Sequence, residues 1–167
     1  MDVPERENGQ ICAAFLRKLG LTEDRHKRMK VIKAYARMNT RLADRILVGA
    51  LSDPCEEIRG YLVRELGGKS DLDISLTFPK LAGPPWYARS AVLKIMGMRR
   101  DAAAIPRIET ILCDSNADVR KCAAEALGEI GGRDALRLLV RLKKDGNPYV
   151  RQAAEEGLRK ASEVRFS

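Results

Sequence analysis

Apolar residues recur every three or four positions along most of the chain, a spacing that places them on one face of an α-helix. Ile105, Ile108 and Ile111 form one such stripe, and similar stripes lie on both sides of it. Each stripe is short and is separated from the next by polar or turn-forming residues. A single helix of this kind cannot bury its apolar face alone, so the pattern predicts antiparallel helix pairs that stack on one another.

The helical pattern repeats after about 31 residues, which is typical of a repeat array. A Val-Arg pair at 119–120 returns at 150–151. Counting back, the same place is held by Ala88-Arg89, by Ile58-Arg59 and, another 31 residues earlier, by Lys27-Arg28. The repeats predict an all-α fold, an α-solenoid of about five antiparallel helix pairs within a single domain, residues 1–167. The predicted pairs cover residues 7–38, 41–67, 72–98, 102–130 and 133–162.

Two further positions accompany the repeated arginine. An acidic residue stands six positions before it at Asp53, Asp114 and Asp145. Gly83 stands at this place before Arg89, so Arg89 is expected to lack the usual aspartate. A glycine also lies near the end of three copies, at positions 67, 97 and 128, and it predicts the point where the second helix of each pair stops.

The stretch from Asp114 to Gly128 reads D-x-x-x-x-V-R-x-x-A-A-x-A-L-G. This pattern resembles the HEAT-like repeat named after phycobilisome lyase subunits, and the resemblance covers residues 25–162 well. It implies the α-solenoid fold. It implies little about function, since repeats of this kind serve scaffolds, adaptors, chromophore lyase subunits and DNA-repair glycosylases.

The repeated acid and arginine have a structural interpretation. An aspartate at the turn can cap the following helix, and the arginine can pair with the aspartate of its own or of the next repeat. The residues of this predicted ladder are Asp53, Arg59, Arg89, Asp114, Arg120, Asp145 and Arg151. A phosphate-binding row or a catalytic pair is the alternative. Residues present once in every repeat favour the structural role.

Function is expected at the outward positions of the second helices, which line the concave side in solenoids of this type. If Val119, Ala123 and Leu127 face the core, then Asp118, Cys122, Glu125 and Glu129 point outward. The column through Glu125 is basic in the first three repeats and acidic in the last two. The partner-binding candidates from these columns are Lys30, Lys33, Arg37, Tyr61, Arg64, Tyr87, Lys94 and Tyr149.

Charge is concentrated near the start of the chain. Residues 25–45 hold eight Lys or Arg and one acid, Asp44, and therefore carry seven of the eight net positive charges. Such a segment attracts an acidic protein surface, a phosphate backbone or an anionic membrane. A solvated terminal repeat is the alternative interpretation.

Composition narrows the possible chemistry. His26 is the only histidine, which excludes a multi-histidine metal site and a Ser-His or Cys-His nucleophile system. Four cysteines form no C-x-x-C pair, and Cys122 beside Lys121 is expected to fill a helix face in preference to reacting. No phosphate-binding loop motif, cofactor site or metal site is predicted. The polar start MDVPERENGQ and the lack of a long apolar segment predict a cytoplasmic protein without a membrane span.

Three functions remain open. The first is a non-catalytic scaffold or adaptor that uses its concave face and basic N-terminal half to bind an acidic protein partner. The second is a nucleic-acid-binding protein that contacts the phosphate backbone through Lys30, Lys33, Arg37, Arg64 and Lys94. The third, which rests on the family resemblance, is a subunit or chaperone of an enzyme similar to the bilin lyases.

Overall fold

The computed structural model describes residues 5–163, with side chains described for residues 10–161. All regular structure in this part of the chain is helical, which confirms the prediction of an all-α solenoid. The chain divides into two compact units, Met1–Leu76 and Thr77–Ser167, which are described separately below. The single domain expected from the length stays a prediction.

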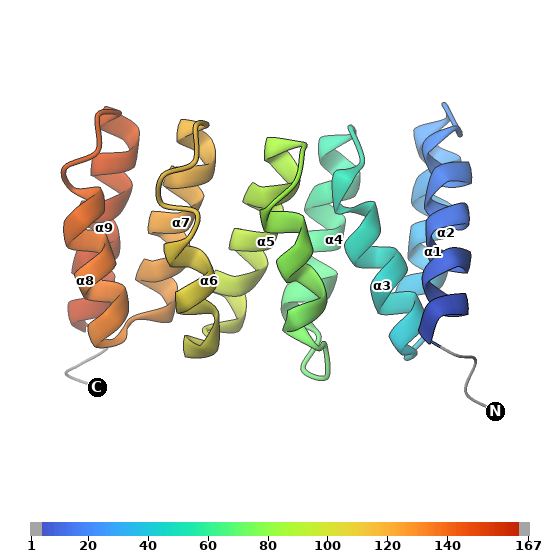
Figure 1. The fold of residues 1–167 in the computed structure, drawn as a ribbon, viewed down its shortest axis with the longest axis horizontal. Helices are drawn as coiled ribbons and strands as arrows, with labels where there is room; N and C mark the ends of the chain where they lie inside the picture. The colour runs from blue at the N-terminus through green and yellow to red at the C-terminus, as the bar shows by residue number, and fades with distance from the viewer. Residues whose placement is uncertain (1–4, 164–167) are drawn as a thin grey trace. The chain divides into compact units, whose positions relative to one another are not determined.

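The first unit contains four α-helices (Figure 1). They are α1 (Glu5–Gly20), α2 (Arg25–Ala36), α3 (Arg41–Gly49), which continues into the short 3-10 helix η1 (Ala50–Ser52), and α4 (Glu56–Gly68). Asp24 begins α2 by accepting hydrogen bonds from the backbone N–H groups of His26 and Lys27, at 2.8 and 3.3 Å. Thr40 begins α3 in the same way. The core of this unit is aliphatic, with Ile32, Ile46, Leu51, Ile58, Leu62 and Leu66 fully buried.

The second unit contains the remaining helix pairs, and the 3-10 helix η2 (Ile74–Leu81) begins just before it. It holds α5 (Trp86–Arg99), the 3-10 helix η3 (Ala102–Ala104) followed by α6 (Ile105–Glu109), α7 (Ala117–Ile130), α8 (Gly132–Leu142) and α9 (Pro148–Glu163). The predicted pairs agree with these bounds to within a few residues. One difference is η2, a 3-10 helix where an α-helix was expected, and Pro79 inside it explains this because proline lacks a backbone donor.

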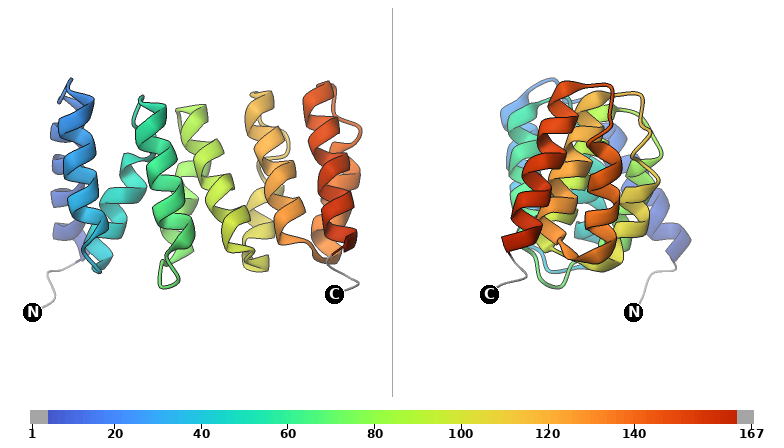
Figure 2. Two further views of the ribbon diagram at one scale, coloured as in Figure 1. Left: turned by 180° about the vertical axis from the view of Figure 1, so that it is seen from behind. Right: turned by 90° about the vertical axis from the view of Figure 1, so that its left-hand side faces the viewer.

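The helices α5, α7 and α9 lie side by side in the second unit (Figure 2). Glycines allow their backbones to approach closely. A Cβ atom added at Gly128 would lie 2.6 Å from the Cα of Gly157, and one added at Gly97 would lie 3.0 Å from the Cα of Ala126. Both glycines are inside their helices, so the expectation that they stop the helices is wrong. The residues with positive φ come later, at Arg100 and Gly131, with φ of 50° and 69°.

Candidate functional site

One repeated contact joins successive helix pairs in the first unit. Arg28, in the first turn of α2, is buried and donates from Nε and Nη2 to the two carboxylate oxygens of Asp53, at 2.8 and 3.1 Å. Its remaining nitrogen, Nη1, donates to the backbone carbonyls of Thr22 and Glu23, at 2.7 and 3.0 Å. Asp53 also accepts the backbone N–H of Cys55 at the start of the next helix. Arg28 thus ties the turn of its own repeat to the turn of the following repeat.

The same geometry occurs twice in the second unit. Arg89 donates from Nε and Nη2 to Asp114, at 2.7 and 3.0 Å, and Arg120 donates to Asp145, at 2.8 and 2.9 Å. The expectation that Arg89 lacks its aspartate is therefore wrong. The arginine reaches forward to the acid of the next repeat, and its own turn contributes only a backbone carbonyl, which Gly83 supplies at 3.0 Å.

These ion pairs shift the pKa values of the paired side chains. The hydrogen bonds from Arg120 hold the pKa of Asp145 below its usual range, against the opposing effect of burial. The same bonds raise the pKa of Arg120, and the bonds to Asp53 raise the pKa of Arg28. The charged forms are thus the stable ones, and both sides of each guanidinium are occupied by atoms of the protein itself. This geometry is that of a structural clamp between repeats.

Two further ladder residues, Arg59 and Arg151, keep the contact to their own turn. Arg59 donates from Nη1 to the carbonyls of Asp53 and Pro54, both at 2.8 Å. Arg151 donates from Nη1 to the carbonyls of Asp145 and Gly146, at 2.8 and 3.0 Å. Every ladder arginine thus donates to a backbone carbonyl in the turn of its own repeat. The ion pair, by contrast, requires an aspartate in the turn of the next repeat.

The partner-binding candidates of the first unit lie on α2 and α4 and at the end of α2. Lys30, Lys33 and Arg37 are exposed at helical spacing, so they share one face of α2. On α4, Arg64 is exposed and Tyr61 is half-buried. The ammonium group of Lys33 lies 5.5 Å from the centre of the Tyr61 ring, within cation–π range. We call these five residues, Lys30, Lys33, Arg37, Tyr61 and Arg64, the α2–α4 cluster.

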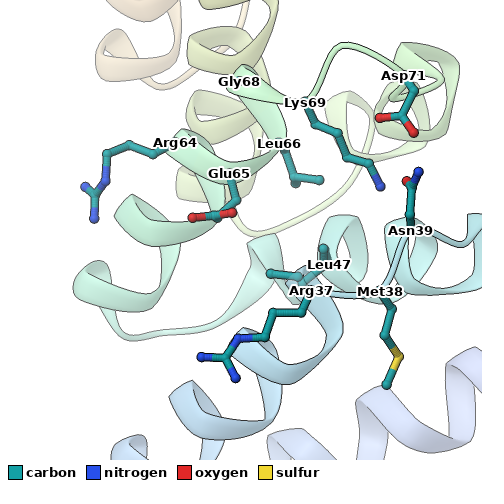
Figure 3. A pocket seen from close by; sticks show the side chains of 11 residues that line it. Arg37, Met38, Asn39, Leu47, Arg64, Glu65, Leu66, Gly68, Lys69 and Asp71 are labelled. Atoms are coloured by element: carbon teal, nitrogen blue, oxygen red, sulfur yellow. The ribbon is translucent and has the colours of Figure 1, made fainter.

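An open cleft of about 640 Å³ adjoins this cluster, lined by residues from the ends of α2 and α4. Figure 3 shows Arg37, Arg64 and Glu65 on one side of the cleft, and Lys69, Asp71 and Asn39 on the other. Lys69 forms an ion pair with the buried Asp44, at 2.6 Å. The positive charge that the cleft offers to a ligand therefore comes mainly from Arg37 and Arg64.

Sequence reasoning missed Glu65, which lies among the basic residues. Burial raises the pKa of Tyr61, the negative charge of Glu65 raises it further, and the positive charge of Arg37 partly offsets both effects. Tyr61 therefore keeps its hydroxyl proton at neutral pH, and a hydrogen bond to Glu65 contributes to this. Prediction from periodicity compares only equivalent outward positions of successive repeats, and Glu65 occupies none of the positions compared.

The basic segment 25–45 also exposes less charge than its sequence indicates. Arg28 is buried in its pair with Asp53, and Arg41 lies 3.5 Å from Asp73. The equivalence of Arg28 with Arg59, 31 residues later, was the signal that could have assigned Arg28 to the ladder. What remains exposed on α2 is mainly the basic part of the α2–α4 cluster and its N-terminal turn.

The other candidates lie in the second unit. Lys94 on α5 and Tyr149 on α9 are exposed, and Tyr87 on α5 is half-buried against Trp86. All members of the column through Glu125 are exposed: Lys33, Arg64, Lys94, Glu125 and Glu156. In the second unit the column through Cys122 was wrongly placed outward, since Ala91, Cys122 and Ala153 are buried. The cause is that α7 packs against both α5 and α9, which widens its buried stripe. Burial also raises the pKa of the Cys122 thiol, which disfavours the reactive thiolate.

Within residues 5–163, no three His, Cys, Asp or Glu side chains come together as ligands for a metal ion. None of the helices in the same part of the chain is both long and apolar enough to span a bilayer.

Comparison with known proteins gives two matches. Residues 74–159, about half of the chain, match the sequence model of HEAT repeats. The chain is also similar to deoxyhypusine hydroxylase of Danio rerio, with 36% identity over 108 residues, which is 60% of this chain and 33% of the relative. The chain thus spans about a third of the length of that curated relative.

Proposed function

Because the chain belongs to the HEAT repeat family, we propose that it is a non-catalytic scaffold whose α2–α4 cluster binds an acidic segment of a protein partner. HEAT repeats generally mediate protein interactions, and their function resides in the outward residues that vary between repeats. In this chain the outward column is basic at Lys33, Arg64 and Lys94 and acidic at Glu125 and Glu156. The partner is therefore expected to bring carboxylates to the first unit.

The observation that carries the proposal is that Lys33 and Arg37 lie near Tyr61, while Arg37 and Arg64 line an open cleft. Arginine side chains recognise carboxylates through paired N–H donors, and a tyrosine contributes contact area at a low cost in conformational entropy. Arg37 and Arg64 line the cleft together with the neighbouring Glu65. An incoming acidic side chain would meet these two guanidinium groups first.

Glu65 favours a protein over a nucleic acid as the partner. A phosphate backbone requires a continuous row of positive charge, and Glu65 places a negative charge between Arg37 and Arg64 (Figure 3). The single aromatic ring of the cluster, Tyr61, is half-buried and paired with Lys33, which leaves little ring surface for base stacking. A protein partner can place its acids and donors around Glu65.

The non-catalytic part of the proposal is supported by the sequence. His26 is the only histidine, and it is exposed in the first turn of α2. The name of the Danio rerio relative describes a hydroxylase, but the shared segment is a third of that protein. We therefore propose common repeats and not a common reaction.

The test is a quantitative affinity purification from native lysate with the full chain as bait. The test variant carries Lys30→Glu, Lys33→Glu and Arg37→Glu. A control variant of equal charge change carries Arg133→Glu, Lys143→Glu and Lys144→Glu, three exposed residues of the second unit. Each purification is performed with and without nuclease, and circular dichroism confirms that all baits are folded.

We expect proteins that survive nuclease and bind the control variant like the wild type, but are reduced at least about tenfold on the test variant. Loss of the same proteins after nuclease treatment would replace the proposal with binding to nucleic acid. Equal recovery on the test and control variants would show that the α2–α4 cluster is not the binding site.

A further inference from the structure

Arg151 makes the carbonyl contacts of a ladder arginine but not its ion pair with a carboxylate. Its Nη1 donates to the carbonyls of Asp145 and Gly146, just as Nη1 of Arg120 donates to Asp114 at 2.7 Å and Ser115 at 3.4 Å. In Arg120, Nε and Nη2 then bind a carboxylate. Among the described residues, no acidic side chain pairs with Nε or Nη2 of Arg151. Arg28, Arg89 and Arg120 thus show this guanidinium with its carboxylate, and Arg151 shows it without one.

The two hydrogen bonds from Nη1 to backbone carbonyls fix the orientation of the Arg151 guanidinium. A free arginine loses much side-chain entropy when it binds, whereas Arg151 is half-buried and already held by two carbonyl groups. The remaining edge, formed by Nε and Nη2, has the spacing of the two oxygens of a carboxylate. Arg28, Arg89 and Arg120 show the outcome when a carboxylate is supplied, with N···O distances of 2.7 to 3.1 Å.

The outer face of α9 determines what kind of carboxylate can approach. Inside the second unit, the next repeat supplies the acid while its helix packs closely over Ala124 and Gly128. The equivalent positions in α9 are Glu155 and Arg159, both exposed. A helix cannot approach Arg159 as Gly157 approaches Gly128, where even a Cβ would lie 2.6 Å from the facing Cα. The carboxylate must therefore arrive on a loop or on an element packed less closely than α9 packs on α7.

A second copy of this chain does not offer the matching loop. The position equivalent to Asp53, Asp114 and Asp145 in the first repeat is Thr22, as its carbonyl contact with Arg28 shows. The hydroxyl of Thr22 donates to the carbonyl of Lys18. Head-to-tail stacking of two copies would therefore place no aspartate opposite Arg151 in the ladder register.

We propose that Arg151 is a recognition site for an aspartate on a protein partner that accepts the backbone N–H two residues later in its own turn, as Asp53 accepts the N–H of Cys55. The chain itself supplies the model for this ligand: in Asp114-Ser115-Asn116 and Asp145-Gly146-Asn147, the aspartate accepts the asparagine N–H at 2.9 and 2.8 Å and presents both oxygens to an arginine. This site lies on the second unit. It is independent of the α2–α4 cluster, so either site can fail without the other.

The test uses the full chain with ¹⁵N-labelled arginine, whose Nε–Hε signals report carboxylate binding. The probe is the capped peptide acetyl-Asp-Ser-Asn-amide, and acetyl-Asn-Ser-Asn-amide is the control without a carboxylate. Arg133, exposed at the start of α8, serves as the reference for an arginine that no carbonyl orients. The Arg151→Lys variant assigns the Arg151 signal.

We expect a saturable downfield shift at Arg151 with the Asp peptide, with an affinity at least about fivefold higher than at Arg133. The signals of Arg89 and Arg120 are expected to stay in place, because their carboxylates are already bound. The proposal is overturned if Arg151 responds no more than Arg133, or if the Asn peptide produces the same shift.

Discussion

Arg120 and Asp145 form a two-point ion pair in which both nitrogens of one guanidinium edge bind both oxygens of one carboxylate, at 2.8 and 2.9 Å. The two residues are 25 positions apart, and Arg89 with Asp114 and Arg28 with Asp53 repeat the same separation. The arginine belongs to one helix pair and the aspartate to the next. The ladder is therefore a contact between repeats, and its energetic effect is expected in the cooperativity of stacking.

Replacing Arg120 with Gln is expected to destabilise the second unit by about 2 to 4 kcal/mol, because Asp145 would keep a largely buried charge without its partner. Trp86 is the only tryptophan and lies in this unit, so its fluorescence during urea unfolding reports the change. The matched control is Arg151→Gln, which removes only the own-turn contacts and is expected to cost about 1 kcal/mol. Equal losses in the two variants would contradict a stabilising role for the carboxylate pair.

The pKa of Asp145 predicts a dependence of stability on pH. In the folded protein this pKa is below its usual range because of the Arg120 hydrogen bonds, whereas in the unfolded chain it returns to about 3.9. The unfolded state therefore takes up the proton first as pH falls. The contribution of Asp145 is fully present above about pH 5 and is lost as pH falls through the folded-state pKa. We expect the difference in unfolding free energy between wild type and Asp145→Asn to shrink between about pH 5 and pH 2.

A double-mutant cycle isolates this effect from the other carboxylates. In an Arg120→Gln background the largest cause of the lowered Asp145 pKa is absent, while the N–H of Asn147 and the charge of Arg151 remain. The further substitution Asp145→Asn is then expected to show a clearly weaker pH dependence than it shows in the wild-type background. A cycle with the same pH dependence in both backgrounds would show that Arg120 is not the cause.

Close packing of α7 on α9 makes Gly128 sensitive to a single methyl group. A Cβ there meets the backbone of Gly157 at 2.6 Å, so Gly128→Ala is expected to destabilise the second unit by about 1 to 3 kcal/mol in urea unfolding. Gly60 in α4 is the control, since a Cβ at this position meets only the flexible end of Arg64, at 3.7 Å. Gly60→Ala is expected to stabilise the first unit by about 0.5 to 1 kcal/mol. A Gly128→Ala protein as stable as the wild type would show that the helices can separate freely.

The sequence predicted the helix pairs well because each repeat must satisfy the same local requirements. The positions of the ladder arginines followed from periodicity alone. Their partners did not, because periodicity identifies equivalent residues but not neighbouring ones. The aspartate six positions earlier in the sequence looked like the natural partner of Arg89, and its replacement by Gly83 looked like a defect. In the structure, Arg89 binds Asp114 and requires only a carbonyl from Gly83.

Gly128 and Cys122 show a second limit of the sequence. A glycine near a helix end is typical of a stop signal, but Gly128 lies inside α7, where it admits the backbone of α9. Cys122 lies on the face that a helix with one packed side would expose, and it is buried because α7 is packed on two sides. Both differences arise from packing between repeats. In the α2–α4 cluster, by contrast, exposure followed the helical pattern at Lys30, Lys33 and Arg64.

The four cysteines provide a test of this packing by chemical reactivity. Cys113 is exposed, whereas Cys122 is 8% exposed and its thiol has a pKa raised chiefly by burial and further by Glu125. In the folded protein near pH 7.5, we expect iodoacetamide to modify Cys122 at least about tenfold more slowly than Cys113, as measured by mass spectrometry of the peptides. In concentrated guanidinium chloride the two rates should converge. Glu125→Gln is expected to leave Cys122 slow, because burial is the larger cause. Rapid modification of Cys122 in the folded chain would mean that α7 separates from α5 and α9 far more often than their close packing predicts.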